Sequence, residues 1–193
     1  MASGSLVPQN DNIERQNYFL IVSRLAAYKG IEIAIEACNQ LKLPLKIVGT
    51  GRERDRLQKM SKVTLDSEVE FLGFRSDEEL AQLYQNCRAV IFPTADEDFG
   101  IVPVEANAFG KVVIPPRSGG VLETQVEGKT AAFFDPGSVD SLVEVLSRFD
   151  GSKFLAEECI QNAQSFSETR FRSKFEDLVS SVILGGGATP ESI

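Results

Sequence analysis

Short apolar runs alternate with amphipathic segments along most of the chain, and this alternation restricts the possible folds more than any other feature. The first run, Tyr-Phe-Leu-Ile-Val-Ser at residues 18–23, is apolar almost throughout, as expected of a parallel strand covered on both faces. Between such runs, apolar residues recur at helical spacing. The pattern predicts an α/β fold with a single Rossmann-like, doubly wound parallel sheet of about six strands and helices on both faces. The expected strands are residues 18–23, 45–48, 69–72, 89–92, 112–114 and 131–134.

Capping residues indicate where several helices begin. Ser76 and Glu79 have the spacing of a capping box, which opens a helix, and Ser138 is a second candidate cap. Two final helices, at about 153–165 and 167–184, have no strand after them. We therefore expect a linker or cloning remnant at residues 1–15, one domain at 16–184, and a disordered tail at 185–193.

Composition excludes several classes of function. The chain has 193 residues and a net charge of −8, which is unfavourable for a general nucleic-acid binder. Three widely separated cysteines and no histidine predict neither a metal site nor a disulfide framework. No apolar run is long enough to span a bilayer, and no signal peptide is visible. These features predict a cytoplasmic protein, with the inner face of the cell membrane as an alternative location for the full-length protein.

Cations, glycines and carboxylates gather where the expected strands end. In a doubly wound sheet, ligands bind in the crevice outside these carboxyl ends. The cations can neutralise a diphosphate, the glycines let a ligand approach the backbone closely, and the carboxylates can bind hydroxyls. The combination suits a nucleoside diphosphate sugar. In strand order, the candidates are Arg24 and Lys29, then Gly49 and Gly51, then Phe74, then Glu97, Asp98, Phe99, Gly100 and Ile101, and finally Ser118, Gly119 and Gly120.

The stretch at residues 94–110 combines an acidic loop with the start of a helix. Pro103 fits the first helical turn, where its missing N–H is tolerated. The free N–H groups at such a helix start suit a phosphate or a hydroxyl. A ribose diol needs an acceptor that can take two hydrogen bonds, and we assign this role to Glu105. Glu97 is then expected to bind the transferred sugar.

Each of these features also has a plainer interpretation. The spacing of Arg24 and Lys29 is common on solvated faces, and Glu105 can simply stabilise the start of its helix. Residues 49–51 can form an ordinary turn, and residues 119–120 a simple helix-entry loop. The dinucleotide fingerprint Gly-x-Gly-x-x-Gly is absent after the first strand. The ordered occurrence of all these residues at strand ends favours the functional interpretation.

Five motifs in register resemble one known family. Residues 97–106 read Glu-Asp-Phe-Gly-Ile-Val-Pro-Val-Glu-Ala and resemble that family's Glu-x7-Glu signature. The chain is similar to the C-terminal, nucleotide-sugar-binding half of the GT-B glycosyltransferases in the large retaining group known as glycosyl transferases group 1. Within the group it most resembles mannosyltransferases of bacterial polysaccharide and lipopolysaccharide assembly. The other matching residues are 22–25 with 29–30, 48–51, 71–73 with 81–84, and 118–120 with Glu123.

The resemblance implies a reaction and a set of residues. A hexosyl group, with mannosyl as the first candidate, would move from a nucleoside diphosphate sugar to a glycan or lipid-linked acceptor with retention of configuration. The donor would be a GDP- or UDP-sugar, with no prosthetic group and no metal. Arg24, Lys29 and Glu97 take the catalytic role by this resemblance. The donor-binding residues are Gly49, Gly51, Phe74, Asp98, Phe99, Gly100, Ile101, Glu105, Ser118, Gly119 and Gly120.

The resemblance also implies that the chain is one half of an enzyme. Its main partner would be a missing N-terminal, acceptor-binding domain, so the chain alone is expected to bind the donor weakly and to transfer no sugar. The helix at 167–184 normally braces that domain, and its apolar stripe is expected to be partly exposed and to favour dimers. Two alternatives stay open: a non-catalytic nucleotide-sugar-binding or regulatory module, and an unrelated doubly wound protein such as a nicotinamide dehydrogenase domain or an epimerase.

Overall fold

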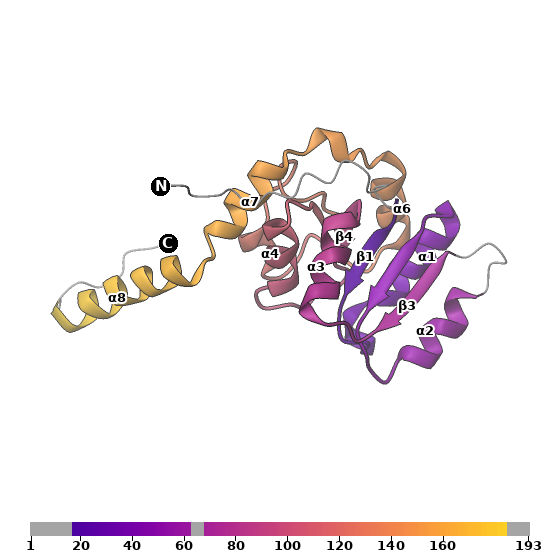
Figure 1. Cartoon of the computed structure of the whole chain (residues 1–193), viewed down its shortest axis with the longest axis horizontal. Helices are drawn as coiled ribbons and strands as arrows, with labels where there is room; N and C mark the ends of the chain where they lie inside the picture. Colours follow the sequence, from indigo (N-terminus) through magenta and orange to yellow (C-terminus); the bar gives the residue numbers. More distant parts are fainter. Residues whose placement is uncertain (1–16, 63–67, 185–193) are drawn as a thin grey trace, which may run out of the picture.

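The structure, a computed structural model, describes residues 17–62 and 68–184. The expected linker at residues 1–15 and the expected tail at 185–193 lie outside the described residues. The described part contains one parallel sheet whose strands have the order β3-β2-β1-β4-β5 (Figure 1). Its strands are β1 (Phe19–Val22), β2 (Leu45–Val48), β3 (Val69–Gly73), β4 (Ala89–Ile91) and β5 (Val113–Ile114).

This strand order confirms the doubly wound arrangement. The chain moves outward from β1 through β2 to β3, then returns to β4 on the other side of β1 and continues to β5. The reversal between β1 and β4 creates a crevice at the carboxyl ends of these two strands, which is where doubly wound folds bind ligands.

The expected sixth strand, at residues 131–134, forms single bridges instead of a ladder. Ala131 pairs with Val113, and Phe134 pairs with Pro116. Pro115 and Pro116 lack the N–H group that a continuous ladder requires, so pairing beside β5 is interrupted. The segment lies where it was expected, but the regular sheet has five strands.

The helices begin near their predicted starts. Ser76 forms the complete capping box with Glu79, and the Ser138 side chain accepts a hydrogen bond from the Ser141 N–H. The α-helices are α1 (Ile31–Leu41), α2 (Arg54–Ser61), α3 (Asp77–Asn86), α4 (Ile101–Ala108), α5 (Val121–Thr124), α6 (Val139–Arg148), α7 (Ala156–Gln164) and α8 (Glu168–Leu184). Two 3-10 helices, η1 (Ala27–Lys29) and η2 (Gly151–Lys153), complete the described elements.

Two apolar clusters fill the two faces of the sheet. Phe19 and Ile21 of β1 pack with α1, α2 and α6, whereas Leu20 packs with α3, α4 and α5 on the other face. Successive side chains of a strand point to opposite faces. A strand buried on both faces is therefore apolar at every position, which explains the uninterrupted first run.

Helix α8 projects away from the body of the domain (Figure 1). Its apolar side chains are exposed in the described structure, in agreement with the expectation for this stripe; they are Phe171, Phe175, Leu178, Val179, Val182 and Ile183. Among the residues that the structure describes, no helix is both long and apolar enough to cross a membrane.

Candidate functional site

The loops after β1 and β2 pack directly against each other through their backbones. The Ser23 N–H donates to the Val48 carbonyl at 3.0 Å, and the Leu25 N–H donates to the Thr50 carbonyl at 2.9 Å. A Cβ atom at Gly49 would lie 1.9 Å from the Ser23 oxygen, and one at Gly51 would lie 2.1 Å from the Leu25 oxygen. These glycines are therefore required by the contact between the two loops, whatever ligand they meet.

A cavity of about 600 Å³ opens beside these loops. Arg24, Gly49, Gly51 and Phe74 all line it, so four of the predicted site residues come together here. Phe74 follows β3 and is 79% exposed, which makes its ring available to a ligand. Arg75, which also follows β3, lines the same cavity, as does Asp77 at the first turn of α3; neither was among the predicted site residues.

A second cavity, of about 310 Å³, lies between the loops after β1 and β4. It is lined by Arg24, Lys29, Glu97 and Ile101, so Arg24 belongs to both cavities. Lys29 Nζ donates to Glu97 Oε2 at 2.5 Å, and both side chains are partly shielded from solvent. The two residues are 68 positions apart, but they follow the neighbouring strands β1 and β4, which brings their opposite charges together.

The acidic loop is fastened to the loop after β5. The Gly120 N–H donates to the Glu97 carbonyl at 2.7 Å, and Ser118 Oγ donates to the Ala95 carbonyl at 2.8 Å. A Cβ atom at Gly120 would lie 2.0 Å from the Asp98 oxygen. Ser118, Gly119 and Gly120, which were predicted as donor-binding residues, thus lie against the acidic loop through backbone contacts that the sequence did not indicate.

Helix α4 begins directly after this loop. Its N-cap is Gly100, with φ +80, a conformation that favours glycine. Glycine has no side chain to accept a hydrogen bond from the first turn, so the N–H groups there are suited to an anionic ligand. Pro103 lies in this first turn, as predicted. The exposed side chains of Asp98, Phe99 and Ile101 flank the helix start.

Glu105 is exposed on α4, and it does not line either of the two cavities. Its Oε2 accepts a hydrogen bond from the Tyr84 hydroxyl of α3 at 3.2 Å. Tyr84 is 1% exposed. Burial, followed by the Glu105 carboxylate, raises the pKa of the Tyr84 phenol, so the hydroxyl remains a donor. Tyr84 lies in the matching segment 81–84, but sequence reasoning did not place it in the site, because at its helical spacing a tyrosine is indistinguishable from an ordinary core residue.

The site thus combines three chemical features at one edge of the sheet. Arg24 and Lys29 supply positive charge, α4 supplies backbone donors at its start, and Glu97 supplies a carboxylate within reach of Lys29. Such an arrangement can bind a phosphorylated ligand that also carries hydroxyl groups. In the described part of the chain, no group of three or more His, Cys, Asp or Glu side chains is placed to hold a metal ion.

Comparison with known proteins identifies the family. Residues 5–166 match the family described as Glycosyl transferases group 1. The chain belongs to this family. The family predicted from the motifs is therefore confirmed, and the alternative of an unrelated dehydrogenase or epimerase domain is excluded.

Individual relatives agree with this assignment. The chain is 31% identical over 134 residues to an O-antigen chain mannosyltransferase C of Escherichia coli, covering 68% of this chain and 36% of that protein. It is also 31% identical over 163 residues to a D-inositol 3-phosphate glycosyltransferase of Corynebacterium urealyticum, covering 76% of this chain and 38% of that protein. The chain thus spans well under half the length of these curated relatives.

A solved structure shows the same fold. The crystal structure of Anabaena Alr3699/HepE in complex with UDP superimposes with a TM-score of 0.74 at 28% sequence identity. The match covers 86% of this chain and 49% of that one. The described domain therefore corresponds to one Rossmann-like half of the GT-B fold, as the motifs predicted.

Proposed function

We propose that this chain is the donor-binding half of a retaining hexosyltransferase. The enzyme would move a hexosyl group, with mannosyl as the first candidate, from a nucleoside diphosphate sugar to a glycan or lipid-linked acceptor. The observation that carries the proposal is the position of Arg24, which lines both cavities at the reversal point of the sheet. Support comes from the related Anabaena structure, which contains UDP, and from the mannosyltransferase among the relatives.

In this proposal the diphosphate lies between Arg24, Lys29 and the start of α4. Arginine and lysine bind phosphate oxygens through charge-assisted hydrogen bonds, and they stabilise the negative charge that develops on a departing nucleoside diphosphate. Without a ligand, Lys29 is paired with Glu97. Donor binding would draw Lys29 to the phosphates, which frees the Glu97 carboxylate to accept hydrogen bonds from the transferred sugar.

The base and ribose would lie towards the larger cavity. Phe74 offers an exposed ring for stacking, and Gly49 and Gly51 leave space along the backbone. Glu105 would accept the ribose hydroxyls with the oxygen that Tyr84 does not bind. The loop at residues 118–120 would hold the acidic loop in place through its backbone bonds.

The acceptor site is proposed to lie outside this chain. The chain covers 49% of the related Anabaena structure, so a complete enzyme of this family has a second half. We propose that this second half binds the acceptor, and that the present chain binds the donor without transferring its sugar. The exposed apolar stripe of α8 is a further surface that the second half, or a second copy of this chain, would cover.

A thermal-shift panel of GDP-, UDP- and ADP-sugars tests the proposed donor class. A ligand at 100 times its dissociation constant stabilises a protein by about 2.7 kcal/mol, so the correct donor should raise the melting temperature clearly. We expect one nucleotide class to stabilise the domain more than the others, and NAD(H) to have no effect. A panel in which no nucleotide sugar changes the melting temperature would contradict the proposed function.

Tyr84→Phe tests whether the carboxylate of Glu105 binds the ribose. The substitution removes the hydroxyl that holds Glu105 Oε2 at 3.2 Å. The Tyr84 hydroxyl positions the carboxylate and is not itself a ligand of the ribose, so we expect its loss to lower the affinity for the preferred nucleoside diphosphate by about tenfold. Calorimetric titration measures this loss, and the 2′,3′-dideoxy analogue should show no difference between the two proteins.

Tyr18→Phe is the matched control. Its hydroxyl donates to the Leu83 carbonyl at 2.9 Å, so this substitution also removes a buried tyrosine bond to α3 without touching Glu105. It should leave nucleotide affinity unchanged. An equal loss of affinity for the nucleoside diphosphate and for its dideoxy analogue in Tyr84→Phe would show that Glu105 does not bind the ribose.

A further inference from the structure

Phe99, at the end of the acidic loop, contacts the segment that joins α7 to α8. The rings of Phe99 and Phe166 meet edge to face, with their centres 5.6 Å apart and their planes at 81°. Phe166 lies between Gln164, the last residue of α7, and Glu168, the first residue of α8. Phe99 directly precedes Gly100, the N-cap of α4. The contact therefore joins the start of α4 to the segment from which α8 projects.

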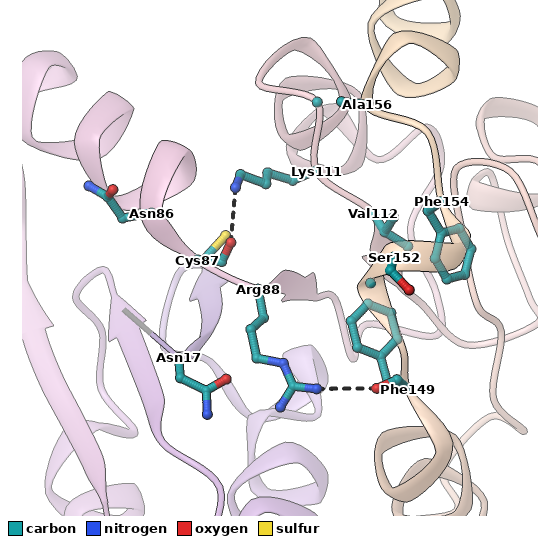
Figure 2. A pocket seen from close by; sticks show the side chains of 12 residues that line it. Asn17, Asn86, Cys87, Arg88, Lys111, Val112, Phe149, Ser152, Phe154 and Ala156 are labelled. Atoms are coloured by element: carbon teal, nitrogen blue, oxygen red, sulfur yellow. Dashed lines mark hydrogen bonds between the residues drawn. The ribbon is translucent and has the colours of Figure 1, made fainter. Parts of the chain in front are cut away.

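Helix α7 is itself fixed along α4. Asn162 Nδ2 donates to Oδ1 of the buried Asn107 side chain in α4 and to the Thr124 carbonyl in α5, both at 2.8 Å. Beyond the other end of α4, a Cβ atom at Gly110 would lie 3.0 Å from the Cβ of Ala156, the first residue of α7. Both residues line a cavity of about 500 Å³, where Ala156 is labelled in Figure 2. Helix α7 thus runs antiparallel to α4 and brings the segment that follows it to the start of α4.

The backbone of Phe99 is held as well as its ring. The hydroxyl of the buried Thr124 donates to the Phe99 carbonyl at 3.4 Å, and the carbonyl of the same threonine accepts from Asn162. Two residues earlier, the Glu97 carbonyl accepts from the Gly120 N–H at 2.7 Å. Although the Phe99 side chain is exposed, its carbonyl is held by α5 and its ring by the segment after α7.

The position of Phe99 matters because Glu97 is two residues before it. In the proposed donor site, the Glu97 carboxylate binds the transferred sugar. Such a group must be held within about 0.5 Å of its productive position by the packing of its neighbours. A shift of Phe99 would move the short loop that carries this carboxylate, so the contacts of Phe99 bear on the geometry of the sugar site.

We propose that Phe166 is a positioning residue for the donor site. Its ring holds Phe99, and through Phe99 it fixes the carboxylate of Glu97 in the orientation that the transferred sugar requires. This inference rests on the proposed function, in which Glu97 binds that sugar. Phe166 lines neither of the two donor cavities, so it acts on the loop and not on the ligand directly.

Amide hydrogen exchange in Phe166→Ala tests the effect on the loop without any ligand. The Gly120 N–H reports the position of the acidic loop, because it donates to the Glu97 carbonyl. Loss of the edge-to-face pair should speed its exchange by about three- to tenfold. The Leu25 N–H, which donates to the Thr50 carbonyl at 2.9 Å, should exchange at its original rate. Unchanged exchange at Gly120, or the same acceleration at both amides, would contradict the proposal.

Binding measurements separate positioning from a purely structural role. The probes are GDP and GDP-mannose, or UDP and UDP-glucose if the thermal-shift panel favours uridine nucleotides. In Phe166→Ala we expect the affinity for the nucleotide sugar to fall by about three- to tenfold, and that for the nucleoside diphosphate to stay the same, because only the sugar reaches Glu97. Equal losses for the two ligands would reject this inference alone. Absence of binding by the unchanged protein would reject the proposed function and this inference with it.

Phe171→Ala is the matched control. Phe171 is exposed on α8 and stacks with Phe175, with ring centres 6.0 Å apart. The substitution therefore also removes one ring of an aromatic pair, close to Phe166 in sequence but in a pair that does not include Phe99. We expect exchange at Gly120 and the affinities for both probes to be unchanged. Effects as large as those of Phe166→Ala would show that the contact with Phe99 is not their cause, and the proposal would be wrong.

Discussion

Gly49→Ala is expected to destabilise the domain by about 3–5 kcal/mol, a loss typical of a severe local clash. The added Cβ would lie 1.9 Å from the Ser23 oxygen, and backbone rather than a flexible side chain would have to move. Gly49 also has φ +130, where side chains are disfavoured. Urea unfolding monitored by circular dichroism measures the change. Nucleotide affinity should fall as well, because the Ser23 loop carries Arg24.

Gly73→Ala is the matched control for this prediction. Gly73 ends the neighbouring strand β3 and also has a positive φ, of +71, but a Cβ atom there would meet nothing within 4 Å. Its substitution should therefore cost only the backbone strain, about 1–2 kcal/mol. If the two variants lose the same stability, the close packing of the loops after β1 and β2 does not restrict position 49.

The architecture could be predicted because it depends on local patterns. Short, mainly apolar runs identified the five regular strands, although Lys46 and Glu70 interrupt two of them, and Ser76 and Ser138 identified two helix starts. Such signals come from residues that are close together along the chain, so they can be read from a single sequence. The exception was the segment at 131–134, where Pro115 and Pro116, directly after the adjacent strand β5, interrupt pairing. That effect depends on which strand lies alongside, so periodicity within one segment does not reveal it.

The candidate site was predicted as a set of residues but not as a set of contacts. Placement at strand ends brought Arg24, Lys29 and Glu97 into one cavity. The bond between Lys29 and Glu97 and the bond between Tyr84 and Glu105 join residues 68 and 21 positions apart. These pairs follow from the packing of neighbouring loops and helices, which a single sequence does not specify.

The roles of the glycines show the same limit, that a single sequence does not specify contacts between distant segments. In the sequence, Gly49, Gly51 and Gly120 looked like positions where a ligand meets the backbone. In the structure, each is required where one loop meets another, with Cβ clashes of 1.9–2.1 Å. A glycine that permits loop packing and a glycine that admits a phosphate have the same sequence signal, because both need the space of a missing Cβ.

Arg24→Ala is expected to weaken the binding of a nucleoside diphosphate by about 30-fold, as follows from losing charge-assisted hydrogen bonds of about 2 kcal/mol. Arg24 is exposed and lines both cavities, so its removal should affect the ligand without unfolding the domain. We propose that Arg24 and Lys29 bind mainly the phosphate farther from the ribose. A nucleoside monophosphate, which lacks that phosphate, should therefore lose at most about threefold in affinity.

Calorimetric titration of both nucleotides into the unchanged protein and the variant measures this difference. Arg172→Ala is the control, because Arg172 is exposed on α8, pairs with Glu168 and lines neither cavity. It makes the same change in net charge, so a general electrostatic effect would appear in both variants. An equal loss of affinity for mono- and diphosphates in Arg24→Ala would show that Arg24 does not bind the diphosphate. If the unchanged protein binds no nucleotide, the proposed donor site itself is wrong. The comparison therefore separates an error in one residue's role from an error in the proposed function.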